Sequence, residues 1–400
     1  MPVEAAVEAA VEAAVEAALD PPLAHGTPLC SGRLRGQPED FVVEELLGFE
    51  AAGAGQHVLL RVRKRNANTQ WVAGELARAC GCRPGDVGYA GLKDRRAVAT
   101  QWFTVPQSRL STVDWVGIRS DEYDVLEAHR HSRKLPRGAL AGNRFVIRVR
   151  GVTIDDASLT SRFSAIGTRG VPNYFGPQRF GRGGANLKRI GEDLRKLRPA
   201  ERGFILSAAR SLIFNAALAE RVGDGSWERL EAGDLANLDG RASHFRVEAV
   251  DETLAERSTR LDVHPTGPLW GRGAPPSSGR VLELEQRVAS GLTAACELVE
   301  RAGMDQERRS LRLAVRDLRW RRDVRAAGAE AAAGTAAGAD APAGTDAPAG
   351  ADVAAGADVA AGADAADSVV VDFRLSRGAY ATVVLREVFA LEADYDESST

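Results

Sequence analysis

A biased tract near the carboxyl-terminal end limits how this chain of 400 residues can fold. Between residues 326 and 367 the sequence consists mostly of Ala, Gly, Pro and Asp, and an aspartate recurs every six residues. Hexapeptide β-helices share this period, but their rungs need bulky aliphatic residues facing inward, and the tract offers only Val353 and Val359. We therefore expect a disordered loop that separates a long first part of the foldable sequence from a short second part.

Two other segments are acidic and of low complexity. Within residues 1–25 a Val-Glu-Ala-Ala tetrad repeats from Val3 to Ala18, and we expect a frayed extension without a role in the fold; residues 393–400 form an acidic tail. With Glu392, the three segments hold sixteen of the 55 acidic residues and no Lys or Arg. The remainder has 39 acids against 52 bases, so a net charge of −3 conceals a structured part near +13. Such a surplus is typical of proteins that bind a polyanion, and nucleic acid is the leading partner.

The cysteines and the hydropathy pattern exclude other classes of protein. None of the four cysteines belongs to a Cys/His pattern that holds zinc, so we expect free thiols in a reducing compartment and no metal. No apolar run reaches eighteen residues, which excludes a transmembrane helix, and the acidic start does not fit a signal peptide. The sequence therefore predicts a cytoplasmic protein.

Hydrophobic periodicity predicts a mixture of strands and helices. We expect residues 42–46 and 57–63 to form a hairpin, and the spacing from 169 to 317 indicates a separate, more helical domain. The strand expected at 369–375 should return to the first sheet. The other predicted strands are 87–90, 101–105, 123–130 and 144–150, and the predicted helices are 69–80, 157–167, 203–222 and 380–388.

The run from Gly88 to Trp102 places one acid, Asp94, among glycines and bases. Glycines allow close backbone approach to a ligand, and the neighbours Lys93, Arg95 and Arg96 favour the ionised carboxylate, as a nucleophile requires. The same residues also fit a solvated turn in which Asp94 accepts from local backbone amides. The glycine spacing does not match a phosphate-binding loop.

Six motifs in a fixed order resemble the TruD family of tRNA pseudouridine synthases. The resemblance covers about 32–392 apart from the repeat tract. The motifs are Pro38–Val43, Gly88–Trp102, Gly142–Phe145, Pro172–Gly181, Leu206–Ser211 and Gly378–Thr382.

This resemblance implies an α+β fold: a pseudouridine-synthase catalytic domain with a mainly antiparallel sheet, interrupted by an α/β insertion domain of the TruD type. The first part of the catalytic domain would then span 26–168, the insertion 169–317, and the second part 318–325 together with 368–392. The repeat tract would lie between two catalytic-domain strands, where a surface insertion is tolerated.

The resemblance also implies site residues. Asp94 falls on the catalytic aspartate, Phe41 and Tyr380 line the uridine pocket, and Asn143 contacts the uracil or its sugar. Arg35 occupies a position where the family more often carries lysine, and we expect it to face Asp94 as a charge partner. Phe41 also fits an ordinary core residue, and Asn143 fits a turn cap.

We therefore expect an isomerase that converts uridine to pseudouridine at position 13 of tRNA, with the uridine flipped out of the RNA and no cofactor. We expect a monomer. An alternative is an RNA-binding protein of the same fold whose catalysis has lapsed. A glycosidase or phosphotransferase using Asp94 with Glu122 or Asp124 is a weaker hypothesis, because nothing in the sequence brings a second acid to Asp94.

Overall fold

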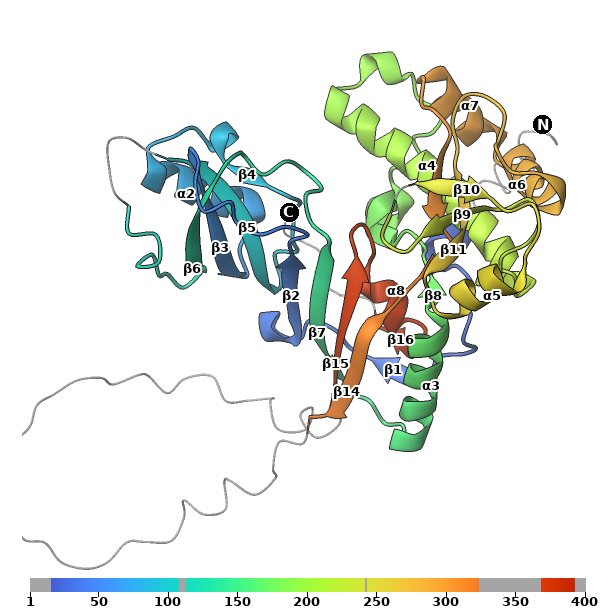
Figure 1. Ribbon diagram of the computed structural model, residues 1–400, viewed down its shortest axis with the longest axis horizontal. Coiled ribbons are helices and arrows are strands. Elements are labelled where there is room, and N and C mark those ends of the chain that lie inside the picture. The colour runs from blue at the N-terminus through green and yellow to red at the C-terminus, as the bar shows by residue number, and fades with distance from the viewer. Residues whose placement is uncertain (1–15, 108–112, 242, 324–367, 393–400) are drawn as a thin grey trace, which may run out of the picture.

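The computed structural model describes residues 16–107, 113–241, 243–323 and 368–392. Figure 1 shows two lobes beside one another, with the long strands β7, β15 and β14 between them. The first lobe holds most strands of a large sheet, and the second lobe holds most of the helices. The described chain thus mixes helices with mostly antiparallel sheets, which confirms the expected class.

An eight-stranded sheet runs from the centre of the molecule into the first lobe. Its neighbours are antiparallel except for β2 and β5, which are parallel. The strands, in spatial order, are β14 (Arg316–Arg322), β15 (Ser368–Ser376), β7 (Gly142–Arg150), β2 (Phe41–Leu46), β5 (Val98–Pro106), β3 (His57–Arg65) and β6 (Tyr123–His131), with β4 (Gly88–Tyr89) paired to β5.

The expected hairpin between residues 42–46 and 57–63 is wrong. Strand β2 lies between β7 and β5, and β3 lies between β5 and β6. The connecting segment, 47–56, is too long for the two-residue turn that favours a hairpin. Strand β3 instead pairs with β5 over its whole length, from His57 to Arg65.

Helix α2 (Thr69–Cys80) covers one face of the first lobe, as its sequence predicted. The Asn68 side chain accepts a hydrogen bond from the backbone N–H of Gln70, and Gly81 ends the helix in the left-handed conformation with φ 71°. Its apolar side packs on the buried strand residues of β3, β5 and β6. The first residue of α2, Thr69, also contacts the loop after β4, because its hydroxyl accepts from the backbone N–H of Lys93.

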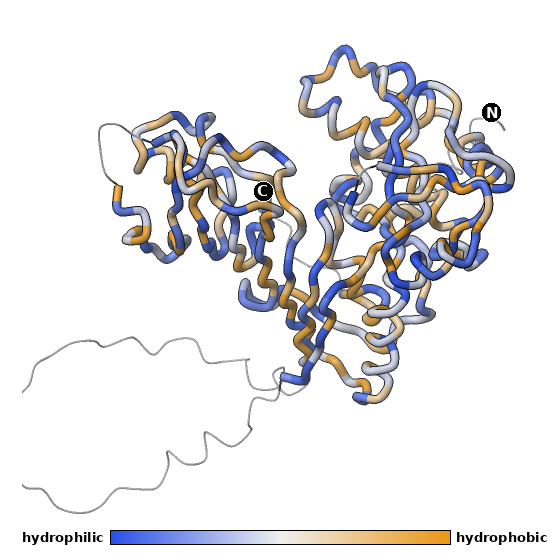
Figure 2. Tube along the Cα trace, viewed as in Figure 1, coloured by the Kyte–Doolittle hydropathy of each residue, from blue (hydrophilic) through white to orange (hydrophobic). Residues whose placement is uncertain are grey.

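The short carboxyl-terminal part returns to the first sheet, as predicted. Strand β15 pairs with β14 on one side and with β7 on the other. After α8 (Ala381–Leu385), which is shorter than the expected helix, β16 (Phe389–Leu391) pairs in parallel with β1 (Cys30–Gly32). Figure 2 shows hydrophobic residues concentrated along the middle strands of the molecule. The predicted disordered tract 326–367 and the tail 393–400 lie outside the described residues.

Residues 16–25 correct the expectation that the amino-terminal segment has no role in the fold. Ala18 is buried in the main core, and the backbone N–H groups of Ala24 and His25 donate to the buried Glu387 carboxylate. The Asp20 carboxylate forms an ion pair with Arg386. The sequence did not indicate these contacts, because two of them are made by backbone N–H groups, which do not depend on the type of side chain.

The second lobe combines a four-stranded antiparallel sheet with helices. Helix α3 (Asp156–Arg169) and the short pair β8 (Val171–Pro172) and β13 (Arg312–Leu313) connect it to the first sheet. None of the helices in the described part of the chain is long and apolar enough to cross a membrane. Its strands are β10 (His244–Arg246), β9 (Leu235–Leu238), β11 (Val263–Leu269) and β12 (Glu307–Ser310), and its helices are α4 (Pro199–Gly223), α5 (Glu252–Thr259), α6 (Gly279–Gly291) and α7 (Thr293–Arg301).

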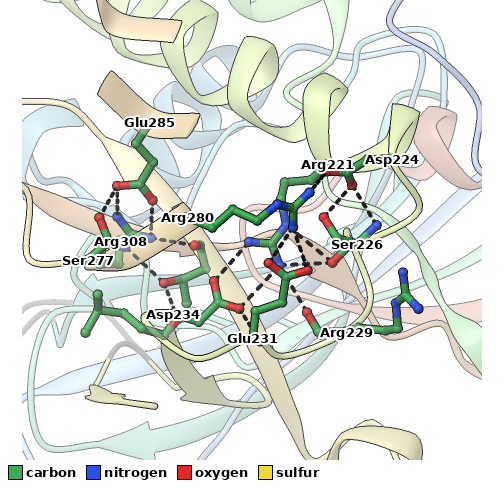
Figure 3. A network of polar contacts seen from close by, with 12 residues as sticks. Arg221, Asp224, Ser226, Arg229, Glu231, Asp234, Ser277, Arg280, Glu285 and Arg308 are labelled. Atoms are coloured by element: carbon green, nitrogen blue, oxygen red, sulfur yellow. Dashed lines mark hydrogen bonds and ion pairs between the residues drawn. The ribbon is translucent and has the colours of Figure 1, made fainter. Parts of the chain in front are cut away.

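Buried ion pairs link the helices and strands of the second lobe (Figure 3). Arg221 of α4 lies 3.0 Å from the Asp234 carboxylate, and both side chains are almost fully buried. Arg308 of β12 lies 2.7 Å from Glu285 of α6 and is equally buried. Each buried guanidinium of this network therefore has a carboxylate partner.

Strand β7 carries arginines on one face, and two of these arginines pair with aspartates. Arg144 makes a bidentate contact with Asp372 of β15, and Arg148 pairs with Asp323 at 2.7 Å. Alternation of apolar residues with arginine would suit contact with RNA, but here acidic neighbours occupy these two arginines. The positive surplus of the chain is therefore not concentrated on this strand.

Candidate active site

Asp94 lies in the loop between β4 and β5 and is accessible to solvent. Its side chain is 41 % exposed, and its Oδ2 atom accepts a hydrogen bond from Nη2 of Arg35 at 2.8 Å. The Arg35 side chain is only 13 % exposed. The expected contact between these two residues is present, and it places a guanidinium against one oxygen of an accessible carboxylate.

The backbone of Arg35 is strained in a way that aims its side chain. Arg35 has φ 56°, in the left-handed region that non-glycine residues rarely adopt. The following turn is held by the buried Asp40, whose two oxygens accept from Arg150 at 2.8 and 2.9 Å. The guanidinium carbon of Arg35 lies 4.6 Å from the ring centroid of Phe41, within cation–π range. One short segment thus carries both Arg35, which contacts Asp94, and Phe41, which contacts Arg35.

Phe41 is buried, and its ring packs against Phe145 of β7 at a centroid distance of 6.2 Å. Phe145 in turn stacks on Phe373 of β15. Phe41 therefore belongs to the main core, as the simpler interpretation held, while also contacting Arg35.

Asn143 lies on β7, paired with Glu45 of β2 and Leu375 of β15. Its side chain is buried, and no described residue donates a hydrogen bond to its Oδ1 atom. A buried acceptor without a donor is unfavourable, which is why such atoms usually mark a place where a ligand or water binds. Asn143 lies within a strand and is therefore not a turn cap.

Lys93 does not pair with Asp94, although it precedes it. Its Nζ atom lies 2.6 Å from Glu45 Oε1, and the Glu45 side chain is completely buried. The other oxygen of Glu45 accepts from the backbone N–H of Trp102 at 2.9 Å. The neighbour in sequence thus anchors the loop to β2, and the distant Arg35 supplies the charge beside the carboxylate.

The side chain of Tyr380 forms a hydrogen bond with a residue of the second lobe. Its hydroxyl accepts a hydrogen bond from Nη2 of Arg179 at 3.1 Å, and Nη1 of Arg179 donates to Ser207 of α4. Arg309 of β12 donates to the carbonyl of Gly378 in the same loop. The structure therefore joins Arg35 to Asp94 and to Phe41 by direct contacts, whereas the polar contact of the Tyr380 side chain among the described residues is with Arg179 of the other lobe.

Three buried polar residues were missed by the sequence reasoning. Lys64, Thr69 and Gln101 each contact the backbone of the loop that carries Asp94. One signal was available: Lys64 is one of only five lysines in a chain with 47 arginines. The contacts themselves join residues that are far apart in the sequence, so no local sequence motif indicates them.

Asp94 and Arg35 place one accessible carboxylate beside a nearly buried cation and the ring of Phe41, and no contact among the described residues joins Asn143 or Tyr380 to this group. Such a site suits a planar polar ring that stacks on an aromatic side chain and reacts with a carboxylate. In the part of the chain that the structure describes, no three His, Cys, Asp or Glu side chains converge as a metal ligand set.

Comparison with known proteins gives one consistent family. The family model for tRNA pseudouridine synthase D (TruD) matches residues 22–202 and 192–388. The tRNA pseudouridine synthase D of Methylococcus capsulatus is 47 % identical over 303 residues, which cover 75 % of this chain and 86 % of that protein. The protein of the same name from Nitrosococcus oceani is 42 % identical over 373 residues, covering 92 % and 93 %.

A solved structure shares the fold. The crystal structure of a Methanosarcina mazei protein assigned to TruD superposes with a TM-score of 0.65 at 21 % sequence identity. The match covers 94 % of this chain and 97 % of that one. Both lobes therefore fall within the matched region.

Proposed function

Because this chain belongs to the TruD family of tRNA pseudouridine synthases, its reaction is the isomerisation of uridine to pseudouridine in tRNA, and we propose that Asp94 carries it out at position 13. The observation that supports this role is the accessible Asp94 carboxylate held 2.8 Å from Arg35. A carboxylate can react only where the substrate reaches it, and the Asp94 side chain is exposed within the loop between β4 and β5.

The chemistry needs only a carboxylate from the protein. The bond between the uracil nitrogen and the ribose breaks, the base turns, and a new bond forms between the same ribose carbon and a ring carbon. The ring carbon loses its proton and the freed nitrogen gains one, so the product is an isomer of the substrate. The reaction has no net oxidation and no net hydrolysis, so we propose that it uses neither a metal nor a cofactor. Asp94 can add to the base, attack the ribose or remove a ribose proton, and each route starts from the ionised form.

The remaining site residues would bind the base after it leaves the RNA stack. A flipped base loses stacking that an aromatic ring can replace, by about 1–3 kcal/mol per base. We assign this contact to Tyr380, with Phe41 closing the pocket beside Arg35. The buried Oδ1 atom of Asn143 would accept from the ring N–H of the uracil, which would satisfy its missing hydrogen bond.

We also propose that the enzyme acts as a monomer in the cytoplasm, and that residues 169–317 form an insertion domain. The contacts of Arg179 and Arg309 with the Tyr380 loop support a role for this region in shaping the uridine pocket.

The alternative is an RNA-binding protein whose catalysis has lapsed. It would not need an accessible Asp94 or the strained Arg35 beside it, and both are retained. These two features favour the active enzyme.

Mapping of pseudouridines in tRNA tests the proposal. Cells that lack the protein should lose pseudouridine at position 13, and the purified protein should restore it on unmodified tRNA. Tight binding of tRNA without product would support the lapsed protein. Product at a different position only would reject the assignment to position 13.

A further inference from the structure

The loop that carries Asp94 has little regular structure of its own. Between β4 and β5, residues 90–97 must find hydrogen-bond partners for their backbone outside a helix or a sheet ladder. Three of these backbone groups meet polar side chains from the interior of the first lobe. The three side chains are those of Lys64, Thr69 and Gln101, and all three residues are at most 1 % exposed.

Two of the side chains form a continuous chain of hydrogen bonds that begins and ends on the loop. The backbone N–H of Lys93 donates to Thr69 Oγ1 at 3.1 Å, and that hydroxyl donates to Gln101 Oε1 at 3.1 Å. Nε2 of Gln101 then donates to the carbonyl of Gly91 at 2.6 Å. All donors point the same way along this chain, an arrangement in which each bond polarises the next.

Lys64 holds the loop one residue further on. Its Nζ atom donates at 2.7 Å to the backbone carbonyl of Asp94, and at 2.7 Å to the carbonyl of Ala67. Lys64 lies near the end of β3, opposite Ala99 of β5, so both of its carbonyl partners belong to segments that leave the sheet. The ammonium therefore ties the loop of Asp94 to the connection between β3 and α2.

The burial of Lys64 is unfavourable for stability alone. Among the described residues no carboxylate forms an ion pair with it, and burial lowers its pKa to about 8, an effect that Lys93 reinforces and Asp94 opposes. Buried charges are normally paired because their desolvation is costly. An apolar residue would fill the same space, but it could not hold the Asp94 backbone.

We propose that Lys64, Thr69 and Gln101 are positioning residues that form a buried clamp on the 90–97 loop and fix the Asp94 carboxylate for reaction. This inference rests on the proposed function. The clamp acts through the backbone of the loop, so the three residues need no contact with RNA. Misplacing a reacting group by about 1 Å can reduce a rate about 100-fold.

Two variants and a matched control test the clamp. Lys64→Met removes the ammonium at similar length, and Thr69→Val removes the hydroxyl at the same shape. Lys134→Met is the control, because Lys134 is an exposed lysine whose Nζ also donates to a backbone carbonyl, that of Gly85. For each protein, kcat and KM are measured on tRNA, and hydrogen–deuterium exchange is followed in the peptide that covers residues 88–102.

Lys64→Met should lower kcat about 10- to 100-fold and Thr69→Val about 5-fold, with KM within about 3-fold of wild type. Exchange in the loop should become faster in both variants, and the control should match wild type in every readout. An unchanged kcat, or an unchanged exchange rate in the loop, would overturn the proposal. If Lys64→Met does not fold, Thr69→Val decides alone. Failure of the proposed function would differ, because wild type itself would then make no pseudouridine.

Discussion

A buried cation of the first lobe, Lys64, differs from two buried cations of the second lobe in the groups that it contacts. In the second lobe, Arg221 and Arg308 each meet a buried carboxylate; one pair connects α4 to the turn before β9, and the other connects β12 to α6. In the first lobe, the buried ammonium of Lys64 meets two backbone carbonyls, one of which belongs to Asp94. A carboxylate partner is not a rule of either lobe, because Lys93 of the first lobe pairs with the buried Glu45, and Arg312 of the second lobe is buried against His264 and backbone carbonyls. Lys64 is distinguished by the group it contacts, because one of its two carbonyl partners is the backbone of Asp94.

Breaking a pair in the second lobe should have the largest effect on stability. Asp234→Asn leaves the buried Arg221 without its counter-charge, which should reduce the unfolding free energy by about 3–5 kcal/mol. Chemical denaturation measures the loss, and kcat of the folded variant should stay within about 3-fold of wild type. Asp262→Asn, which removes an exposed partner of Arg257, is the control and should change stability by less than about 1 kcal/mol. Equal losses in the two variants would contradict the structural role of the buried pair.

The titration of Lys64 should make the unfolding free energy depend on pH. Burial lowers its pKa from 10.5 to about 8, so the folded chain releases this proton at a lower pH than the unfolded chain does. Wild type should therefore gain stability relative to Lys64→Met between pH 8 and 10.5, by about 3 kcal/mol. Below pH 8 both states of the wild type carry the proton, and the difference between the two proteins should be constant. Denaturation curves at pH 7 and pH 10.5 measure this; an equal difference at both values would show that the Lys64 charge carries no burial penalty.

The contact between the lobes should give the smallest effect. Tyr380→Phe keeps the ring but removes the hydroxyl that accepts from Arg179, and should lower kcat/KM about 5-fold, equivalent to about 1 kcal/mol. Arg179→Met should have a larger effect in the wild-type background than in Tyr380→Phe. A double-mutant cycle measures the coupling. Strictly additive effects would mean that the second lobe does not act through this hydroxyl.

The elements that could be predicted from the sequence are those whose caps and apolar spacing lie within a few residues of one another. Helix α2 followed from its Asn68 cap, its apolar spacing and Gly81, all within a few residues of the helix. The pairing of β2 with β5 and β7 did not, because strand partners are chosen by long-range packing and a nearby strand is only the default. The strand after the repeat tract, β15, was placed correctly because its apolar run fits a buried sheet position.

In the candidate site, too, some contacts could be predicted from sequence motifs, whereas contacts between distant residues could not. The contact of Asp94 with Arg35 could be anticipated from motifs that resemble a family, although the immediate neighbour Lys93 turned out to pair with Glu45. The clamp could not be anticipated from the sequence. Lys64 lies 30 positions before Asp94 and contacts its backbone carbonyl, a group that every residue has, so the contact leaves no signal in the sequence. A lysine kept within an arginine-rich chain was the one available hint, since a compact ammonium fits a buried carbonyl site better than a guanidinium.

The most direct test of the central role of Asp94 compares the purified wild type with Asp94→Asn on the same unmodified tRNA. Both proteins should bind the tRNA with Kd values within about 3-fold, because the substitution keeps the size of the side chain. Wild type should form pseudouridine, and the variant should be slower by at least about 10³-fold. Pseudouridine formation by Asp94→Asn at a rate close to wild type would contradict the account.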